Sequence, residues 1–169
     1  MPKSDQGADH QRYQVIPRTL MFVFKGSSVL LLKGAASKKI WAGRYNGLGG
    51  HVEAGEDMLS AAKRELAEEA GIGDIPLYLC GTVVCDVEPD LGILLFVYKG
   101  SAADDLTVLP SHEGTLEWVD PAAIAGLPVV DDLPALLGRV AVWQPGSPVF
   151  SAANRYDETG SLTTHFYEN

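Results

Sequence analysis

The sequence lacks the features that would place the chain in a membrane, in a thiolate metal site or on a nucleic-acid polymer. No apolar run approaches the roughly 20 residues that cross a bilayer, and the first residues contain no apolar secretory core. There are two cysteines but no CxxC pair and no Cys/His ligand spacing, so zinc is not expected. The net charge of −9 disfavours DNA or RNA as a partner. We therefore expect a cytoplasmic globular protein that contacts neither membranes nor nucleic-acid polymers.

The two cysteines, Cys80 and Cys85, fall within one predicted strand. They are separated by an odd number of positions, and side chains alternate between the two faces of a strand. The thiols are therefore expected to point to opposite faces, where they cannot easily form a disulfide, and to remain reduced in the core.

Acidic residues are missing from one continuous stretch, residues 10 to 52. This stretch carries +7, which leaves −16 for the rest of the chain because the total is −9. Its basic residues are Arg12, Arg18, Lys25, Lys33, Lys38, Lys39 and Arg44. An acidic helix follows, so a polyphosphate held between cations such as Lys33 and Arg44 and a carboxylate-bound metal would suit this distribution. An unevenly charged surface is the alternative.

The order of apolar runs and turn residues predicts an α+β domain over residues 15–169, preceded by a mobile polar tail, residues 1–14. Hairpins are expected around "GSS", "EPDLG" and "DETG". Helices are expected over residues 57–70, ending at Gly71, and over residues 131–142. Because hairpins dominate and strands outnumber helices, the pattern favours a sandwich with a mixed sheet over a doubly wound fold.

The first predicted helix carries three closely spaced glutamates, Glu65, Glu68 and Glu69, which repel one another. Its apolar stripe consists of Leu59, Ala62, Leu66 and Ala70. The glutamates form a second stripe roughly 110° from the first, so they flank the side that faces the core. Partly buried carboxylates need compensation, which Mg²⁺ or Mn²⁺ can supply. Arg64 is expected to pair with Glu68 one turn away.

The spacing around this helix matches a known motif. From Gly50 the chain reads "GHVEAGEDMLSAAKRELAEEAGI": glycine, five residues, Glu56, seven residues and then "RELAEEAGI". Every fixed position of the Nudix box is present, and the chain therefore resembles the Nudix (MutT-like) hydrolases. Its pattern is similar to that of the oxidised purine nucleoside triphosphatases, the 8-oxo-dGTP diphosphatase type.

The resemblance implies an α/β/α sandwich around a mixed sheet, with the box as a loop–helix–loop. It also implies hydrolysis of a nucleoside diphosphate linked to another group, with Mg²⁺, or Mn²⁺ as a substitute. The implied metal ligands are the Gly49 carbonyl, Glu65, Glu68 and Glu69. Arg64 and Glu56 would orient these ligands. A further carboxylate often assists the metal or the water; "SHEGTLEWVD" makes Glu113 the candidate, Glu117 the alternative, and exposed loop acids the simpler explanation. The pattern does not decide which glutamate is the general base.

Residues outside the box bear on the substrate. The loop "AGRYNGLGG" resembles that of the oxidised purine triphosphatases, whose matching asparagine, here Asn46, contacts the purine. "LPVVDDLP" resembles their pair of base-reading aspartates, here Asp131 and Asp132. The chain departs from them at Val129, near the place of a stacking tryptophan, and Trp41 could stack from another side. A helix cap at the aspartates and a turn residue at the asparagine are the alternatives.

Three functions follow as hypotheses. The first is a Mg²⁺-dependent pyrophosphohydrolase that converts a nucleoside triphosphate, such as 8-oxo-dGTP, into the monophosphate and pyrophosphate. The second keeps this chemistry for ADP-ribose, a nucleotide sugar or a dinucleotide, since Pro89 lies near the position of a proline typical of the ADP-ribose branch. The third is a non-catalytic nucleotide-binding module, which the complete set of box glutamates disfavours. The expected partner is a small nucleotide, and the chain is expected to be a monomer or homodimer.

Overall fold

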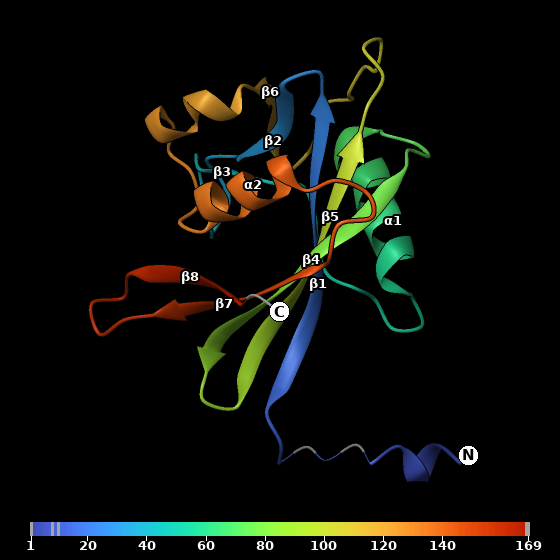
Figure 1. Ribbon diagram of the computed structural model, residues 1–169, viewed down its shortest axis with the longest axis vertical. Helices are drawn as coiled ribbons and strands as arrows, with labels where there is room; N and C mark the ends of the chain where they lie inside the picture. The colour runs from blue at the N-terminus through green and yellow to red at the C-terminus, as the bar shows by residue number, and fades with distance from the viewer. Residues whose placement is uncertain (1, 8, 10, 168–169) are drawn as a thin grey trace.

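The fold is organised around the first long strand, β1 (Gln14–Lys25), in a computed structural model that describes residues 2–7, 9 and 11–167. β1 pairs antiparallel with β2 (Ser28–Gly34) and parallel with β5 (Leu91–Ser101), so the sheet is mixed. The other strands are β3 (Tyr45–Asn46), β4 (Leu77–Glu88), β6 (Gly114–Val119), β7 (Phe150–Tyr156) and β8 (Leu162–Tyr167). The strand order is β3-β2-β1-β5-β4-β7-β8, and β6 also pairs with β2 (Figure 1). The three predicted hairpins are confirmed.

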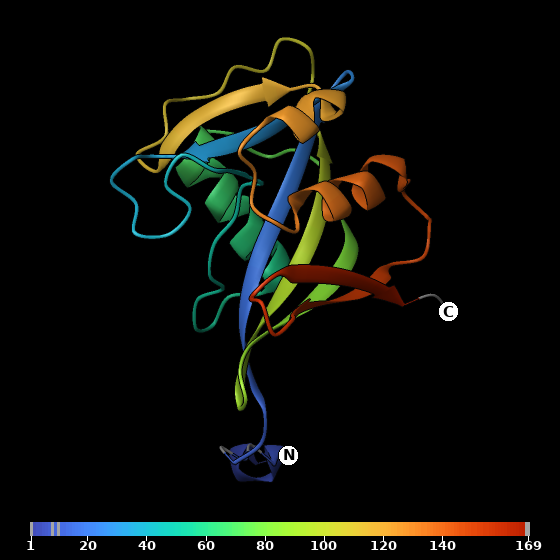
Figure 2. The ribbon, with the colours of Figure 1, turned by 90° about the vertical axis from the view of Figure 1, so that its left-hand side faces the viewer.

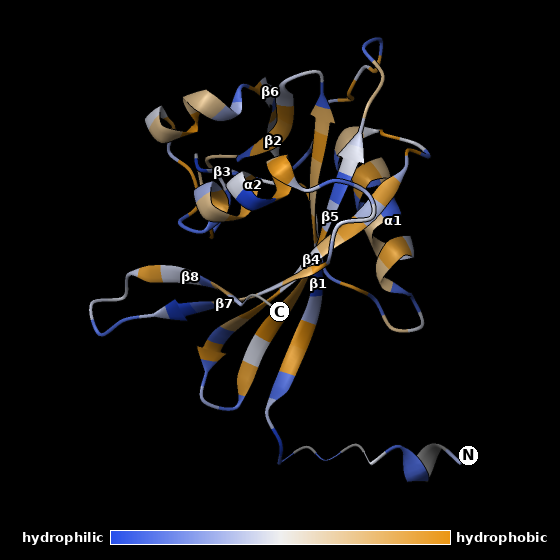
Figure 3. Ribbon diagram, viewed as in Figure 1, coloured by the Kyte–Doolittle hydropathy of each residue, from blue (hydrophilic) through white to orange (hydrophobic). Residues whose placement is uncertain are grey.

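Alternation along β1 creates two cores, one on each face of the sheet. Leu20 and Phe22 pack in a cluster that includes the buried residues of α2 (Leu133–Val142) and of the 3₁₀ helix η2 (Pro121–Gly126). Met21 and Val23 pack in the other cluster, beneath α1 (Met58–Ala70). Figure 3 shows the apolar residues of β1 lying between these helices. The predicted α/β/α sandwich is confirmed.

The helix α1 begins and ends where the sequence predicts, but its buried face is rotated. Asp57 caps it by accepting hydrogen bonds from the Leu59 and Ser60 N–H groups, and Gly71 ends it with a φ of 65°. Leu59, predicted to face the core, is 40% exposed, which corrects the prediction. The buried residues of the helix are Ala61, Ala62, Leu66, Glu69 and Ala70. The core-facing side is therefore turned toward the glutamate stripe, and this rotation buries one carboxylate.

The prediction that the two thiols face opposite ways is wrong. Cys80 and Cys85 both contact the same hydrophobic cluster, because a β-bulge between Leu79 and Gly81 inserts an extra residue and changes the alternation of β4. Both cysteines are free, in agreement with the expected reduced state.

The N-terminal segment projects beyond the end of the sheet and contains the 3₁₀ helix η1 (Lys3–Gln6) (Figures 1 and 2). Three residues of the predicted tail, 1, 8 and 10, lie outside the described residues. The division into a mobile tail and one domain therefore stays a prediction. Among the helices described, none has the length and apolar character to cross a membrane.

Candidate active site

The glycine-rich loop before α1 runs along β1 and meets the carboxylates of the helix. The Thr19 N–H donates to the Gly50 carbonyl at 2.9 Å, which holds this loop against the strand. Gly49 has a φ of 145°, and a Cβ there would lie 2.1 Å from the Thr19 carbonyl oxygen, so this position requires glycine. The Gly49 N–H donates to Glu69 Oε2 at 2.8 Å. The loop and the helix of the box are thereby joined.

Glu69 is a buried carboxylate without a contacting cation. It is 5% exposed, and within residues 2–7, 9 and 11–167 no lysine or arginine forms an ion pair with it. Its pKa is raised to about 8, chiefly by burial and also by the charges of Glu113 and Glu65, while the hydrogen bond from Gly49 and the charge of Lys38 act against this rise. An uncompensated buried charge is costly. The Glu69 carboxylate is therefore suited to bind a cation.

Arg64 is the centre of the ion-pair network on α1. Its Nε and Nη2 donate to the two oxygens of Glu56 at 3.0 and 3.1 Å, and Nη1 donates to Glu65 at 2.9 Å and to Glu68 at 3.2 Å. Nη2 also donates to the His51 carbonyl at 2.9 Å, which ties the helix to the loop. The expected pair with Glu68 is present. These hydrogen bonds are the contacts that an orienting role would use, and the role of Arg64 and Glu56 stays a prediction.

The carboxylate oxygens of the box suit a hard divalent cation, although the described side chains are not arranged as a ligand cluster. No three His, Cys, Asp or Glu residues in the described part of the chain are grouped closely enough to hold a metal ion. The Glu65 and Glu68 side chains, 14% and 60% exposed, are both drawn toward Arg64. A Cβ on Gly50 would lie 2.2 Å from Glu65 Oε1, so only glycine at this position avoids a clash with the Glu65 carboxylate. Oxygen donors of this kind suit Mg²⁺ or Mn²⁺.

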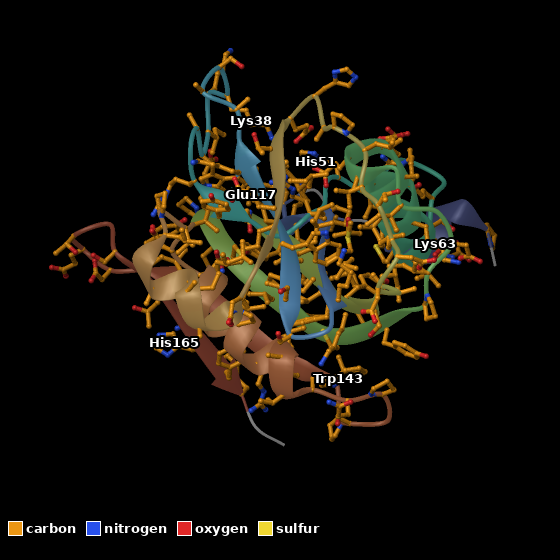
Figure 4. The ribbon with its side chains drawn as sticks, turned by 90° about the horizontal axis from the view of Figure 1, so that it is seen from above. Lys38, His51, Lys63, Glu117, Trp143 and His165 are labelled. Atoms are coloured by element: carbon orange, nitrogen blue, oxygen red, sulfur yellow. The ribbon has the colours of Figure 1, made fainter. Side chains whose placement is uncertain are left out.

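The structure separates the two candidates for the additional carboxylate. Glu113 and Glu69 line one cavity, and Lys38 Nζ donates to Glu113 across it. Glu117 instead accepts a hydrogen bond from the Tyr45 hydroxyl at 2.9 Å. In Figure 4 Glu117 lies toward the middle of the molecule, whereas Lys38 lies on a peripheral loop. Glu113 is therefore the residue that the fold brings to the box carboxylates.

Two adjoining cavities contain most of the predicted site residues. The carboxylate cavity, as we name it, is lined by Glu69, Glu113, Lys38, Leu32 and Gly34 together with six residues that it shares with its neighbour. The aspartate cavity is lined by Asp131, Asp132, Asn154, Tyr156 and several apolar residues. The six shared residues are Arg18, Trp41, Arg44, Asn46, Gly47 and Gly49. An elongated ligand could extend from one cavity into the other.

The aspartate pair does not cap α2 with its side chains. Asp132 stands at the N-cap position, but it makes no capping hydrogen bond; its Oδ2 accepts from Asn154 Nδ2 at 2.7 Å. Burial raises the pKa of Asp132. Asn154, fully buried, accepts a hydrogen bond from the Thr164 hydroxyl at 2.7 Å. Asp131 pairs with Arg44. The side-chain capping alternative is thus wrong for Asp132, and both carboxylates face the cavity.

Asn46 makes the hydrogen bond of a turn residue, and its place in the cavity lining is compatible with a ligand contact. Its Oδ1 accepts from the Gly47 N–H at 2.8 Å, as in a turn, and its side chain also lines both cavities. With the oxygen engaged in this way, the amide NH₂ is the group that can contact a ligand.

Trp41 and Lys33 differ in their relation to the cavities. Trp41 lines both and has a φ of 61°, the one positive value among the described non-glycine residues. Such strain is typical of functional positions. The Lys33 ammonium instead lies over the Tyr45 ring, 5.3 Å from its centroid, and the side chain lines neither cavity. The structure therefore does not bring Lys33 to the site, because alternation along β2 turns it away.

Sequence reasoning missed four cavity residues: Arg18, Cys85, Asn154 and Tyr156. The cavity combines strands that are distant in sequence, through the β1–β5 and β4–β7 pairings, so no local spacing identifies these residues as neighbours. The one usable signal is Asn154, since an asparagine within a run of strand-forming residues requires polar partners if the position is buried.

The chain belongs to the NUDIX family, because the family model described as "NUDIX domain" matches residues 15–137. Mouse oxidized purine nucleoside triphosphate hydrolase is 42% identical to it over 65 residues, and the zebrafish (Danio rerio) protein of the same name is 40% identical. Each alignment covers 38% of this chain and 40% of the relative, so the chain matches less than half of the length of these relatives.

Solved structures share the fold. The Bacillus halodurans MutT protein has a TM-score of 0.74 at 23% identity, covering 90% of this chain and 97% of the other. The NUDIX domain of Shewanella oneidensis NrtR, complexed with ADP ribose, has a TM-score of 0.67 at 14% identity, covering 82% and 96%. At these identities the likeness establishes the fold alone.

A substitution at Gly49 tests how strictly the loop geometry is required. We expect Gly49→Ala to lower the free energy of unfolding by about 3 kcal/mol or more, since the Cβ meets backbone and the φ is unfavourable. Gly55→Ala is the control, because its φ is also positive, at 87°, but no atom lies within 4 Å of the added Cβ. Urea denaturation followed by circular dichroism measures both. Equal losses for the two variants would contradict the close approach to β1.

Proposed function

We propose that the protein is a divalent-metal-dependent nucleotide pyrophosphohydrolase. It would convert a nucleoside triphosphate and water into the nucleoside monophosphate, pyrophosphate and a proton, with 8-oxo-dGTP as the foremost substrate. The observation that carries the proposal is the buried Glu69 carboxylate, which has no ion-pair partner among the described residues, lines the carboxylate cavity and accepts a hydrogen bond from Gly49, a residue that lines both cavities. The family membership and the names of the mammalian and fish relatives support it.

In this proposal the box residues hold the metal and the surrounding residues position them. The ligands would be Glu65, Glu68, Glu69 and the Gly49 carbonyl, with Glu113 as a further acid. A bound divalent ion would neutralise the diphosphate and acidify a water. Arg64 fixes the orientation of the carboxylates through its hydrogen bonds. Lys38 and Arg44, now paired with acids, could exchange those acids for phosphate oxygens.

The aspartate cavity would take the base. Asn46 offers an NH₂ donor, and Asp131 and Asp132 offer acceptors. A guanine edge carries the complementary set, a carbonyl acceptor and adjacent N–H donors. Trp41, which lines the same cavity, would stack on the ring in place of the tryptophan absent at Val129. An oxidised guanine nucleotide fits this arrangement.

A substrate panel with Mg²⁺ tests the function. Candidate substrates are dGTP, 8-oxo-dGTP, dATP, ADP-ribose, a nucleotide sugar and a dinucleoside polyphosphate, with pyrophosphate, orthophosphate and AMP measured separately. We expect pyrophosphate release, fastest from 8-oxo-dGTP. Release of AMP from ADP-ribose without pyrophosphate from any triphosphate would instead establish the second hypothesis. No contact favours that hypothesis, since Pro89 lies in the β4–β5 turn and lines neither cavity.

A further inference from the structure

Arg18 lies where the two cavities meet. It precedes Thr19 on β1, and its backbone forms an isolated bridge with His51, directly after the glycine loop. The side chain is partly buried and lines both the carboxylate cavity and the aspartate cavity. It therefore faces the passage between the box carboxylates and the aspartate pair.

The positive charge of Arg18 acts on a residue of the aspartate cavity. Burial raises the pKa of the Cys85 thiol, which lines that cavity, to about 11, and the positive charge of Arg18 acts against this rise. The charge of Arg18 therefore lies near Cys85, in agreement with the presence of both residues in the lining of the aspartate cavity.

Arg18 differs from the other cations near the site because it has no acidic partner. Arg64 pairs with glutamates of the box, Arg44 with Asp131 and Lys38 with Glu113. Over the residues that the structure describes, no carboxylate lies within ion-pair distance of Arg18.

A cation with a purely structural role in this fold has partners of its own. Lys99 Nζ donates to the carbonyls of Ala141 and Trp143, at 2.9 and 2.7 Å, where it satisfies the end of α2. No comparable acceptor within the described chain holds the Arg18 side chain. A partly buried guanidinium with five N–H donors and no protein acceptor is suited to an anionic ligand.

We propose that Arg18 binds the α-phosphate of the substrate and so holds the nucleotide across both cavities. The inference rests on the proposed function, in which the base occupies the aspartate cavity and the terminal phosphates reach the box carboxylates. The α-phosphate joins the sugar to the rest of the polyphosphate, and it must therefore pass the junction that Arg18 lines. The planar guanidinium can donate two parallel hydrogen bonds to its non-bridging oxygens.

Binding of a monophosphate and of its nucleoside, compared without metal, tests this role. Isothermal titration with 8-oxo-dGMP and with 8-oxo-deoxyguanosine in EDTA would be run on the wild type, Arg18→Gln, Arg18→Lys and the control Arg155→Gln, an exposed arginine of β7. We expect Arg18→Gln to weaken the monophosphate about tenfold or more and the nucleoside less than about twofold. The affinity of Arg18→Lys for the monophosphate should lie between those of the wild type and Arg18→Gln, since lysine keeps the charge but cannot donate two parallel hydrogen bonds. The control should change neither ligand.

The binding results distinguish a failure of the Arg18 phosphate contact from a failure of the proposed hydrolase function. If the wild type binds 8-oxo-dGMP and Arg18→Gln binds it equally well, Arg18 is not a phosphate ligand, while the proposed function stands. Equal weakening of both ligands would also overturn the inference, because it would indicate a change in cavity shape. A wild type that neither binds 8-oxo-dGMP nor hydrolyses 8-oxo-dGTP would overturn the proposed function, and the inference with it.

Discussion

Replacing Glu69 with glutamine is expected to lower kcat by about 10³-fold or more while stabilising the metal-free protein. The amide oxygen can still accept the hydrogen bond from Gly49, so the loop should keep its place. The change replaces a buried ionisable carboxyl, whose charged form has no contacting cation among the described residues, with a neutral amide, and we expect the free energy of unfolding in EDTA to rise by about 1 kcal/mol. A fall in kcat together with a rise in the free energy of unfolding would identify Glu69 as a functional carboxylate that destabilises the folded protein.

Steady-state kinetics and thermal unfolding measure the two effects, and Glu158→Gln is the control. Glu158 is an exposed acid of the C-terminal hairpin, so its substitution should change neither quantity. Mg²⁺ should raise the melting temperature of the wild type and of the control, but much less that of Glu69→Gln. Full turnover in Glu69→Gln would show that the α1 carboxylates are not catalytic. A wild type without turnover on any nucleotide would instead support the non-catalytic module.

Replacing Arg64 with methionine is expected to lower the free energy of unfolding by about 2–3 kcal/mol. Methionine keeps the aliphatic volume but removes the hydrogen bonds to Glu56, Glu65, Glu68 and the His51 carbonyl. Glu56 and Glu65 are partly buried in this network and would lose their cation. Activity should also fall, by about 10–100-fold or more, because the carboxylates would lose their orientation.

The neighbouring Lys63 offers a matched control. Its ion pair with Asp74 is exposed on both sides, so Lys63→Met should change the free energy of unfolding by about 0–1 kcal/mol. Arg64→Lys should recover part of the stability but not the two-point contact with Glu56. Urea denaturation of the three variants measures these differences. Similar values for Arg64→Met and Lys63→Met would contradict the central place of Arg64 in the site.

The local features of the fold could be predicted from the sequence, whereas features created by pairing across the chain could not. The hairpins, the extent of α1 with its end at Gly71, and the whole box depend on spacing within a few turns of chain, and they were predicted correctly. The rotation of α1 that exposes Leu59 and buries Glu69 depends on how the helix sits on the sheet. Amphipathic periodicity defines a helix face only to within about one residue.

The same division applies to the site: residues within the box were predicted, whereas residues brought there by strand pairing were not. Only the pairing of β2 with β6 distinguishes Glu113 from Glu117, because both acids lie within the same stretch, "SHEGTLEWVD". The contact of Asn154 with Asp132 joins β7 to the start of α2, and nothing local to either residue indicates it. Arg18 entered the sequence argument only as one positive charge in a basic stretch. Its place between the cavities follows from the pairing of β1 with the glycine loop.

The central claim is that the carboxylates of α1 and the two cavities form a metal-dependent pyrophosphohydrolase site. The most direct test is product analysis of 8-oxo-dGTP incubated with the wild-type protein, by phosphorus NMR, with Mg²⁺ and with EDTA. The account predicts equimolar 8-oxo-dGMP and pyrophosphate with Mg²⁺ and no products with EDTA. Formation of 8-oxo-dGDP and orthophosphate, or turnover that persists in EDTA, would contradict it.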